Sequence, residues 1–137
     1  MGFFIKIYDQ LHISFFKLKV LLKDVYSFLF IRVYSIILFL VNLSLWYLAF
    51  FMYRKSNQDV AILHYNVDFG IDLIGNKVNF FIIPLLGFIF IIVDKIILLL
   101  LVKKKDFKFW SHFLLSFLLL FHCFLLMSVI STYLINF

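Results

Sequence analysis

Three long apolar runs dominate the pattern of hydrophobic and polar positions along the chain, and short polar or charged segments separate them. The runs cover residues 28–52, 80–102 and 109–134. An α-helix needs about 20 consecutive apolar residues to cross a hydrocarbon core that is roughly 30 Å thick. Each run therefore predicts a transmembrane helix, and we expect an all-α membrane protein with three transmembrane helices over residues 28–137.

Composition supports a membrane protein and excludes a water-soluble domain. Hydrophobic residues make up 66% of the 137 residues, whereas a soluble domain of this size must cover its core with polar surface. The single cysteine, Cys123, lies in an apolar run and cannot form an intramolecular disulfide. No motif for catalysis or for cofactor binding stands out, so we expect neither an enzyme nor a cofactor.

Residues 1–27 are too charged to span a bilayer and too apolar for a tail in water. On a helical wheel at about 100° per residue, one half is mostly polar and the other apolar, which predicts an interfacial amphipathic helix. The alternative is a simple extension of the first transmembrane helix. The polar half holds Lys6, Asp9, Gln10, His12, Lys17, Lys19, Lys23 and Asp24, interrupted by Ile5, Ile13, Phe16 and Val20, and the apolar half holds Phe4, Tyr8, Leu11, Phe15, Leu18 and Leu22.

Lysine and arginine positions predict the orientation and one partner. Basic residues gather before the first run and again between the second and third runs, at residues 103–108. Because cytoplasmic segments carry an excess of Lys and Arg, we expect both regions and the N-terminus inside, and residues 53–79 and the C-terminus outside. Lysines near a membrane surface favour anionic headgroups by about 1 kcal/mol each. The net charge of +6 therefore indicates lipid rather than nucleic acid as the partner.

The outer segment at residues 53–79 is rich in turn-forming residues. Residues 61–67 are typical of a strand, while residues 68–70 and 74–76 have the Asp, Asn and Gly content of turns. This pattern predicts a short hairpin-like cap whose apolar side chains pack on the helix ends or against a partner. The alternative is an ordinary surface loop.

A metal site in this segment is a weaker interpretation. His64, Asp68 and Asp72 are chemically suitable ligands for zinc or manganese. The segment has no cysteine and no second histidine to complete a closed site. We therefore expect the two aspartates to bond backbone amides in turns, and no bound metal.

The order of residues in this segment resembles that of a known family. His64, Tyr65 and Asn66 are followed by Gly70, Asp72, Gly75 and Lys77, and then by an apolar run with an early proline, Pro84. The pattern, over about residues 40–90, resembles a small membrane domain of unknown function found in bacterial immunity proteins against a sporulation-delaying toxin. The resemblance implies two helices joined by an extracytoplasmic loop in a bacterial inner membrane. Ile62 stands where the family usually has proline, and the spacing from Asn66 to Gly70 is one residue longer.

Polar residues also interrupt the apolar runs. Counted from the outer ends at about 1.5 Å per residue, Asn42, His122 and Asp94 lie at depths of about 15, 18 and 21 Å, and Arg32 at about 30 Å. They could meet inside a helix bundle, either as an ion or proton relay or as a structural set in which Asp94 pairs with Arg32. We favour the structural set, because three helices enclose no obvious pathway. Adjacent helix positions point about 100° apart, so we expect Lys95 to reach the inner interface rather than Asp94.

The sequence thus predicts a non-enzymatic integral membrane protein whose outer segment recognises a protein partner or packs on the helix ends, in an immunity-like or sensor-like role. It could act with a protein partner or as a homo-oligomer. One alternative is an accessory subunit of a large membrane complex, for example in the mitochondrial inner membrane, suggested by the 21 phenylalanines. The other is a small ion- or proton-coupled transporter that uses Asp94.

Overall fold

The computed structural model describes residues 2–57, 59–66, 68 and 70–137, with the side chains of residues 2–11, 65, 66 and 72 outside the description. Four α-helices, two β-strands and one 3-10 helix follow one another along these residues. They are α1 (Gly2–Tyr26), α2 (Leu29–Lys55), β1 (Val60–Asn66), β2 (Gly70–Asn76), η1 (Lys77–Phe81), α3 (Ile82–Leu101) and α4 (Phe107–Asn136).

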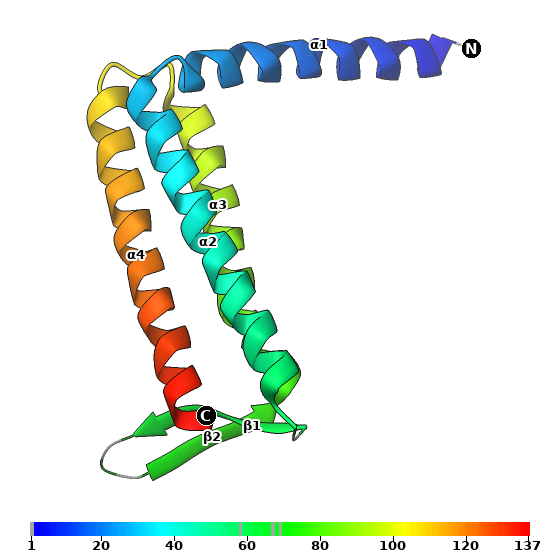
Figure 1. The fold of residues 1–137 in the computed structure, drawn as a ribbon. Coiled ribbons are helices and arrows are strands. Elements are labelled where there is room, and N and C mark those ends of the chain that lie inside the picture. The colour runs from blue at the N-terminus through cyan, green and yellow to red at the C-terminus, as the bar shows by residue number, and fades with distance from the viewer. Residues whose placement is uncertain (1, 58, 67, 69) are drawn as a thin grey trace.

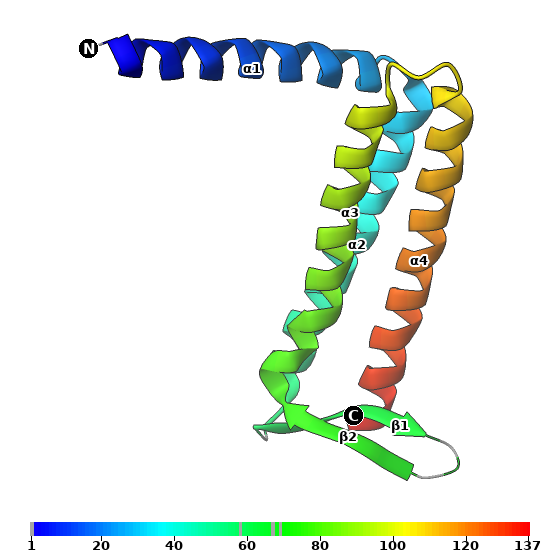
Figure 2. The ribbon, with the colours of Figure 1, turned by 180° about the vertical axis from the view of Figure 1, so that it is seen from behind.

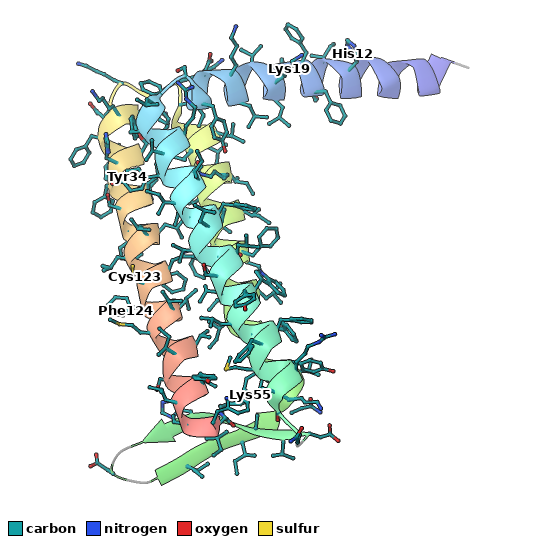
Figure 3. All side chains as sticks on the ribbon, in the orientation of Figure 1. His12, Lys19, Tyr34, Lys55, Cys123 and Phe124 are labelled. Carbon is teal, nitrogen blue, oxygen red and sulfur yellow. The ribbon has the colours of Figure 1, made fainter. Side chains whose placement is uncertain are left out.

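Helices α2, α3 and α4 pack side by side as a three-helix bundle (Figures 1 and 2). Among the described residues, three helical segments are long and apolar enough to cross a membrane: Leu29–Lys55, Lys77–Leu101 and Phe107–Asn136. Large apolar side chains remain exposed along all three (Figure 3), as expected where lipid replaces water. The prediction of three membrane-spanning helices is confirmed, and the chain is a multi-pass integral membrane protein.

Buried positions of the bundle recur at alternating spacings of three and four residues. This heptad-like spacing is that of coiled coils, in which one face of each helix stays turned toward its neighbours. It turns Asn42, Asp94 and His122 toward the bundle interior. The buried positions include Leu38, Asn42, Leu45, Ala49 and Met52 in α2, Pro84, Gly87, Asp94 and Leu98 in α3, and Leu115, Leu118, His122, Leu125, Val129 and Thr132 in α4.

At one end of the bundle, α1 runs crosswise and away from the three helices (Figure 1). The C-terminal end of α1 packs on the bundle, where Val25 is buried. The loop between α3 and α4, with Lys103, Lys104 and Lys105, lies at the same end (Figure 2). The two basic regions that the sequence assigns to one side of the membrane are therefore neighbours in space.

At the opposite end, β1 and β2 form an antiparallel hairpin that lies across the helix ends (Figure 1). Residues 74–76 are part of β2, so the prediction of a turn there is wrong. The other turn, predicted at residues 68–70, lies in part outside the described residues, and Gly70 begins β2. Helix α2 has 27 residues, or a length of about 40 Å. That length matches a bilayer with its headgroups, about 40–45 Å, and separates α1 from the hairpin by one membrane thickness.

Candidate functional site

The hairpin is fastened to the bundle by the side chain of Asn136, at the end of α4. Its Oδ1 accepts a hydrogen bond from the Ile62 backbone N–H at 2.9 Å, and its Nδ2 donates to the Ile62 carbonyl at 2.7 Å. The same Nδ2 donates to the Thr132 carbonyl at 2.8 Å. The carboxamide thus occupies the outer edge of β1 as a neighbouring strand would. A proline at position 62 would have no N–H to donate, so isoleucine suits this contact.

Sequence reasoning missed Asn136. It is 74 residues from Ile62 in the chain, and nothing local to either residue connects them. The one available signal was a carboxamide at the end of an otherwise apolar run.

We expect Asn136→Ala to release the hairpin from α4, because the substitution removes both hydrogen bonds to Ile62. Each such bond contributes about 1 kcal/mol, and more where a backbone group is left unpaired. Amide hydrogen exchange in detergent micelles would report the release as faster exchange at Ile62. Ser128→Ala, an exposed change on the same helix, is the matched control, and equal exchange in the two variants would contradict this role for Asn136.

The 3-10 helix η1, which leads into α3, holds the other side of the hairpin. The Lys77 Nζ lies 3.0 Å from Asp59 Oδ1, and the Lys77 backbone N–H donates to the Asp59 carbonyl at 3.0 Å. The Asn76 side chain accepts from the Val78 N–H at 2.9 Å and so caps η1. Because Asp59 is largely exposed, the ion pair itself adds little stability. The backbone bonds set where β2 leads into the helix.

Two glycines of the motif that resembles the immunity-protein family are required for different structural reasons. Gly70 has φ +77° where β2 begins, a conformation that residues with a Cβ rarely adopt. At Gly75, an added Cβ would lie 2.5 Å from Leu63 Cδ1 and 2.6 Å from Asn79 Nδ2. Gly75 therefore lets β2 pass close to β1 and η1, and does not form a turn.

The remaining motif residues lie on the two strands of the hairpin. His64 is exposed on β1, opposite Leu73. Tyr65 and Asn66 of β1 and Asp72 of β2 have side chains outside the described part of the structure. Gly70, Gly75 and Lys77, the motif residues whose roles can be read, shape and anchor the hairpin.

Strand β2 presents apolar side chains to the surroundings. Ile71, Leu73 and Ile74 are 50%, 52% and 58% exposed. The hairpin is a two-stranded sheet, so β2 is an edge strand with a backbone able to pair with a further strand. The outer edge of β1, by contrast, is already bonded by Asn136 at Ile62. One edge of the hairpin is therefore hydrogen-bonded to α4, and the strand at the other edge exposes apolar side chains.

In the bundle interior, Asn42 and His122 meet at Gly87. The Asn42 Nδ2 donates to the Pro84 carbonyl at 3.1 Å, and His122 Nδ1 lies 2.9 Å from the Leu118 carbonyl of its own helix. A Cβ on Gly87 would lie 2.7 Å from Asn42 Nδ2 and 3.2 Å from His122 Nε2. His122 Nε2 is buried against the Gly87 backbone but makes no hydrogen bond of good geometry. The glycine thus lets three helices and two polar side chains share one layer.

Asp94 does not join this layer. It lies seven residues beyond Gly87 on α3, about 10 Å along the helix axis. Its nearest cation is Lys95, with Nζ 4.0 Å from Asp94 Oδ2, and that oxygen is buried without a hydrogen bond. The expectation that adjacent positions would keep the two apart is wrong, because the long lysine side chain folds back toward the carboxyl group.

Lys95 and Arg32 also differ from their predicted arrangement. Lys95 Nζ donates to Ser35 Oγ at 2.8 Å, and that hydroxyl donates to the Ile31 carbonyl at 2.6 Å. Lys95 thereby links α3 to α2. Arg32 is exposed on α2, and among the described side chains Asp94 makes its ion pair with Lys95 instead of Arg32.

The polar layers are separated by apolar side chains. By helix rise, Leu38 on α2 and Leu118 on α4 lie between the layer of Asn42 and His122 and that of Asp94, and both are buried in one apolar cluster with Leu98 and Leu115. The hairpin and the polar interior are therefore distinct candidate sites, and only the hairpin presents an accessible surface. No family model, no curated protein and no solved structure matches the sequence, so a function rests on the geometry of these residues.

Proposed function

We propose that the protein is a non-enzymatic integral membrane protein that presents its hairpin as a binding surface for an extended polypeptide. The observation that carries this proposal is the contrast between the two edges of the hairpin. One edge is tied to α4 through Asn136, whereas β2 exposes Ile71, Leu73 and Ile74.

The chemistry of β2 supports a strand as the ligand. Natural edge strands are usually protected by charges, proline or covering loops, because their free backbone groups template further pairing. An extended peptide can add a strand through main-chain hydrogen bonds and gain specificity from alternate side chains. Burying one Ile or Leu side chain contributes about 1.5–3 kcal/mol. Three such side chains are therefore enough to favour a peptide of matching apolar pattern.

The side of the membrane follows from the positive-inside rule. Lysines of α1 and of the loop between α3 and α4 gather at the end of the bundle away from the hairpin, and such regions stay on the cytoplasmic side. The hairpin would then face outward from a bacterial cytoplasmic membrane. The resemblance of His64 to Lys77 to the immunity-protein motif makes a secreted peptide toxin the first class of partner to test.

We expect a photo-crosslinking amino acid at Ile71 to form a discrete polypeptide adduct in cells that express the protein. The same residue at Ile92, on the lipid-facing side of α3 and 44% exposed, should yield lipid adducts only. Mass spectrometry would identify the peptide and allow its synthesis. Lipid adducts alone at both positions would mean that β2 rests in the bilayer, and would contradict the proposal.

Binding of that synthetic peptide should depend on β2. Ile74→Lys is expected to raise the Kd by about tenfold or more, since it removes roughly 1.5–3 kcal/mol of apolar burial. Val78→Lys is the matched control, because Val78 is similarly exposed but lies in η1 outside the strand. Calorimetric titration in nanodiscs measures both variants. Equal affinities would locate the peptide elsewhere on the protein.

A further inference from the structure

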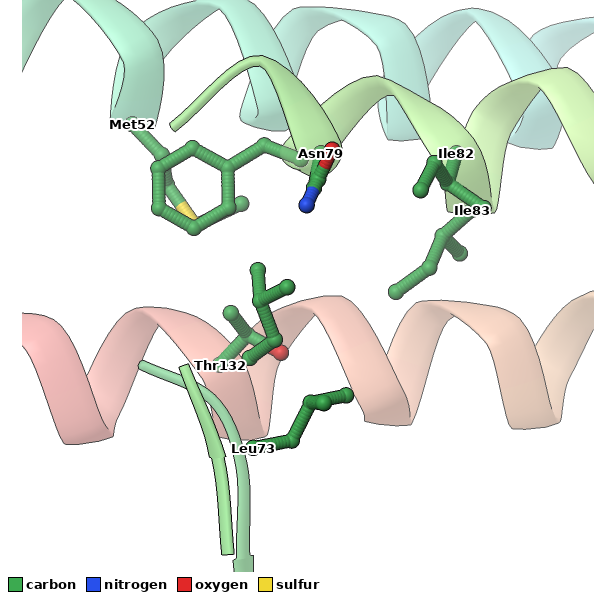
Figure 4. A pocket seen from close by; sticks show the side chains of 8 residues that line it. Met52, Leu73, Asn79, Ile82, Ile83 and Thr132 are labelled. Carbon is green, nitrogen blue, oxygen red and sulfur yellow. The ribbon is translucent and has the colours of Figure 1, made fainter. Parts of the chain in front are cut away.

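A cavity of about 180 Å³ lies in the bundle at the hairpin end. Figure 4 shows it between α4 on one side and α2 with the start of α3 on the other, next to the strands. Its lining is apolar except for one carboxamide and one hydroxyl. The lining residues are Met52, Leu63, Leu73, Asn79, Phe80, Ile82, Ile83 and Thr132.

The exposed fractions of the lining residues distinguish the closed end of the cavity, its floor, from the open end, its mouth. Met52 and Phe80 are 1% and 2% exposed and form the floor, whereas Ile82 and Leu73 are more than half exposed and form the mouth. Ile82 begins α3 and Leu73 lies on β2. The cavity therefore opens where the apolar helix surface meets the hairpin.

The chemistry of the lining favours hydrocarbon over water. The Thr132 hydroxyl already donates to the Ser128 carbonyl at 2.9 Å, so it does not require a water partner. Apolar cavities of about 150 Å³ stay dry and bind benzene. A slightly larger apolar cavity can hold a stretch of hydrocarbon.

The level of the cavity along the bundle indicates which hydrocarbon would reach it. Lys55 Nζ donates to the Tyr133 hydroxyl at 3.1 Å and lies 4.7 Å from the centre of the Phe137 ring at this end of the bundle. Lysine and tyrosine with their apolar neighbours are typical of the headgroup level of a membrane. The side-chain nitrogen of Asn79 points into the cavity (Figure 4) and can donate to an ester carbonyl.

We propose that this cavity binds the acyl chain of a glycerophospholipid from the leaflet at the hairpin end, with the ester group near Asn79. The bound chain fills space between α4 and α3 that the protein itself leaves open. It thereby links the hairpin, through Leu63 and Leu73, to the bilayer. The site shares Leu73 with the exposed surface of β2, but the labelling test of the acyl chain needs no peptide.

Photolabelling from inside the bilayer tests this site. The full chain is reconstituted in vesicles of phosphatidylethanolamine and phosphatidylglycerol that contain a phosphatidylcholine with a diazirine in its acyl chain. After irradiation, mass spectrometry is expected to find label on Met52 and Phe80, which annular lipid cannot reach. Leu45 is equally buried but does not line the cavity, so it sets the background.

Filling the cavity should abolish this labelling. Ile83→Phe is expected to reduce label on Met52 and Phe80 to the Leu45 level, while Ile92→Phe on the lipid-facing side leaves it unchanged. The comparison with Leu45 in the unmodified protein decides the question even if Ile83→Phe fails to fold. Label confined to exposed positions such as Phe88 and Ile92, with Met52 and Phe80 at the Leu45 level, would overturn the proposal.

Discussion

Replacing Gly87 with valine is expected to lower the free energy of unfolding by about 3 kcal/mol, the upper part of the range for overpacked cores. A Cβ at this position would lie 2.7 Å from Asn42 Nδ2 and 3.2 Å from Leu125 Cδ1. Asn42 can yield only by giving up its hydrogen bond to the Pro84 carbonyl. Valine is no worse than glycine as a helix former, so the loss would come from packing. Reversible unfolding in mixed micelles measures it.

A double-mutant cycle gives the control for Gly87. Asn42→Ala removes the atom nearest to the added Cβ, so Gly87→Val should cost at least about 1 kcal/mol less in that background than alone. Leu86→Val, an exposed change one residue away, should have an effect within about 0.5 kcal/mol. Additive effects of the two interior substitutions would show that the helices do not meet closely at Gly87.

The bilayer explains why the sequence predicts the membrane spans well but predicts poorly which faces of the helices pack together. In water, the core face of a helix stands out because the other face is polar. In a bilayer, lipid-facing residues such as Phe39 and Leu43 are as apolar as the buried Leu38 and Leu45. The hydrophobicity of the residues therefore does not distinguish the buried face of a helix from its lipid-facing side. Polar residues such as Asn42 and His122 are the positions that still mark the inner face.

The hairpin illustrates a second limit. The composition of residues 61–66 indicates the strand that is found there, but the turn predicted at residues 74–76 is part of β2, where Gly75 permits a close approach to Leu63 and Asn79. Both explanations suit a glycine, and only the three-dimensional neighbours distinguish them. The hydrogen bonds of Asn136 likewise cannot be predicted from neighbouring residues, because its partner Ile62 lies in β1, 74 residues away in the chain.

Of the four residues that the sequence predicts in a polar cluster, Asn42, Asp94 and His122 are buried, whereas Arg32 is exposed. Helix rise alone places Asn42 and His122 at similar depths, and the structure brings both side chains to Gly87. The estimated depths of Asp94 and Arg32 also predict an ion pair between them, because the long arginine side chain could span the difference. The backbone rotation of α3 instead turns Asp94 inward beside Lys95, while Arg32 stays exposed on α2.

Replacing Asp94 with leucine is expected to raise the free energy of unfolding by about 2 kcal/mol, within the range found when buried ionic groups give way to apolar ones. Asp94 Oδ2 is buried without a hydrogen bond, and its contact with Lys95 is long at 4.0 Å. Lys95 keeps its bond to Ser35 after the change and can extend toward the membrane surface. Unfolding in mixed micelles measures the gain, with Asp94→Asn as the isosteric variant that removes only the charge.

A loss of about 3–5 kcal/mol in Asp94→Leu would instead mean that Asp94 is required to neutralise Lys95. The same variants test the transporter alternative, because an ionisable group inside a membrane span is a natural candidate for a relay. Liposomes that contain the unmodified protein are expected to show no proton or cation flux, since the buried Leu38 and Leu118 lie between the layer of Asp94 and that of His122 by helix rise. Flux that disappears in Asp94→Asn while stability is kept would establish a relay, and the ion pair would then be part of a transport path that opens in another conformation.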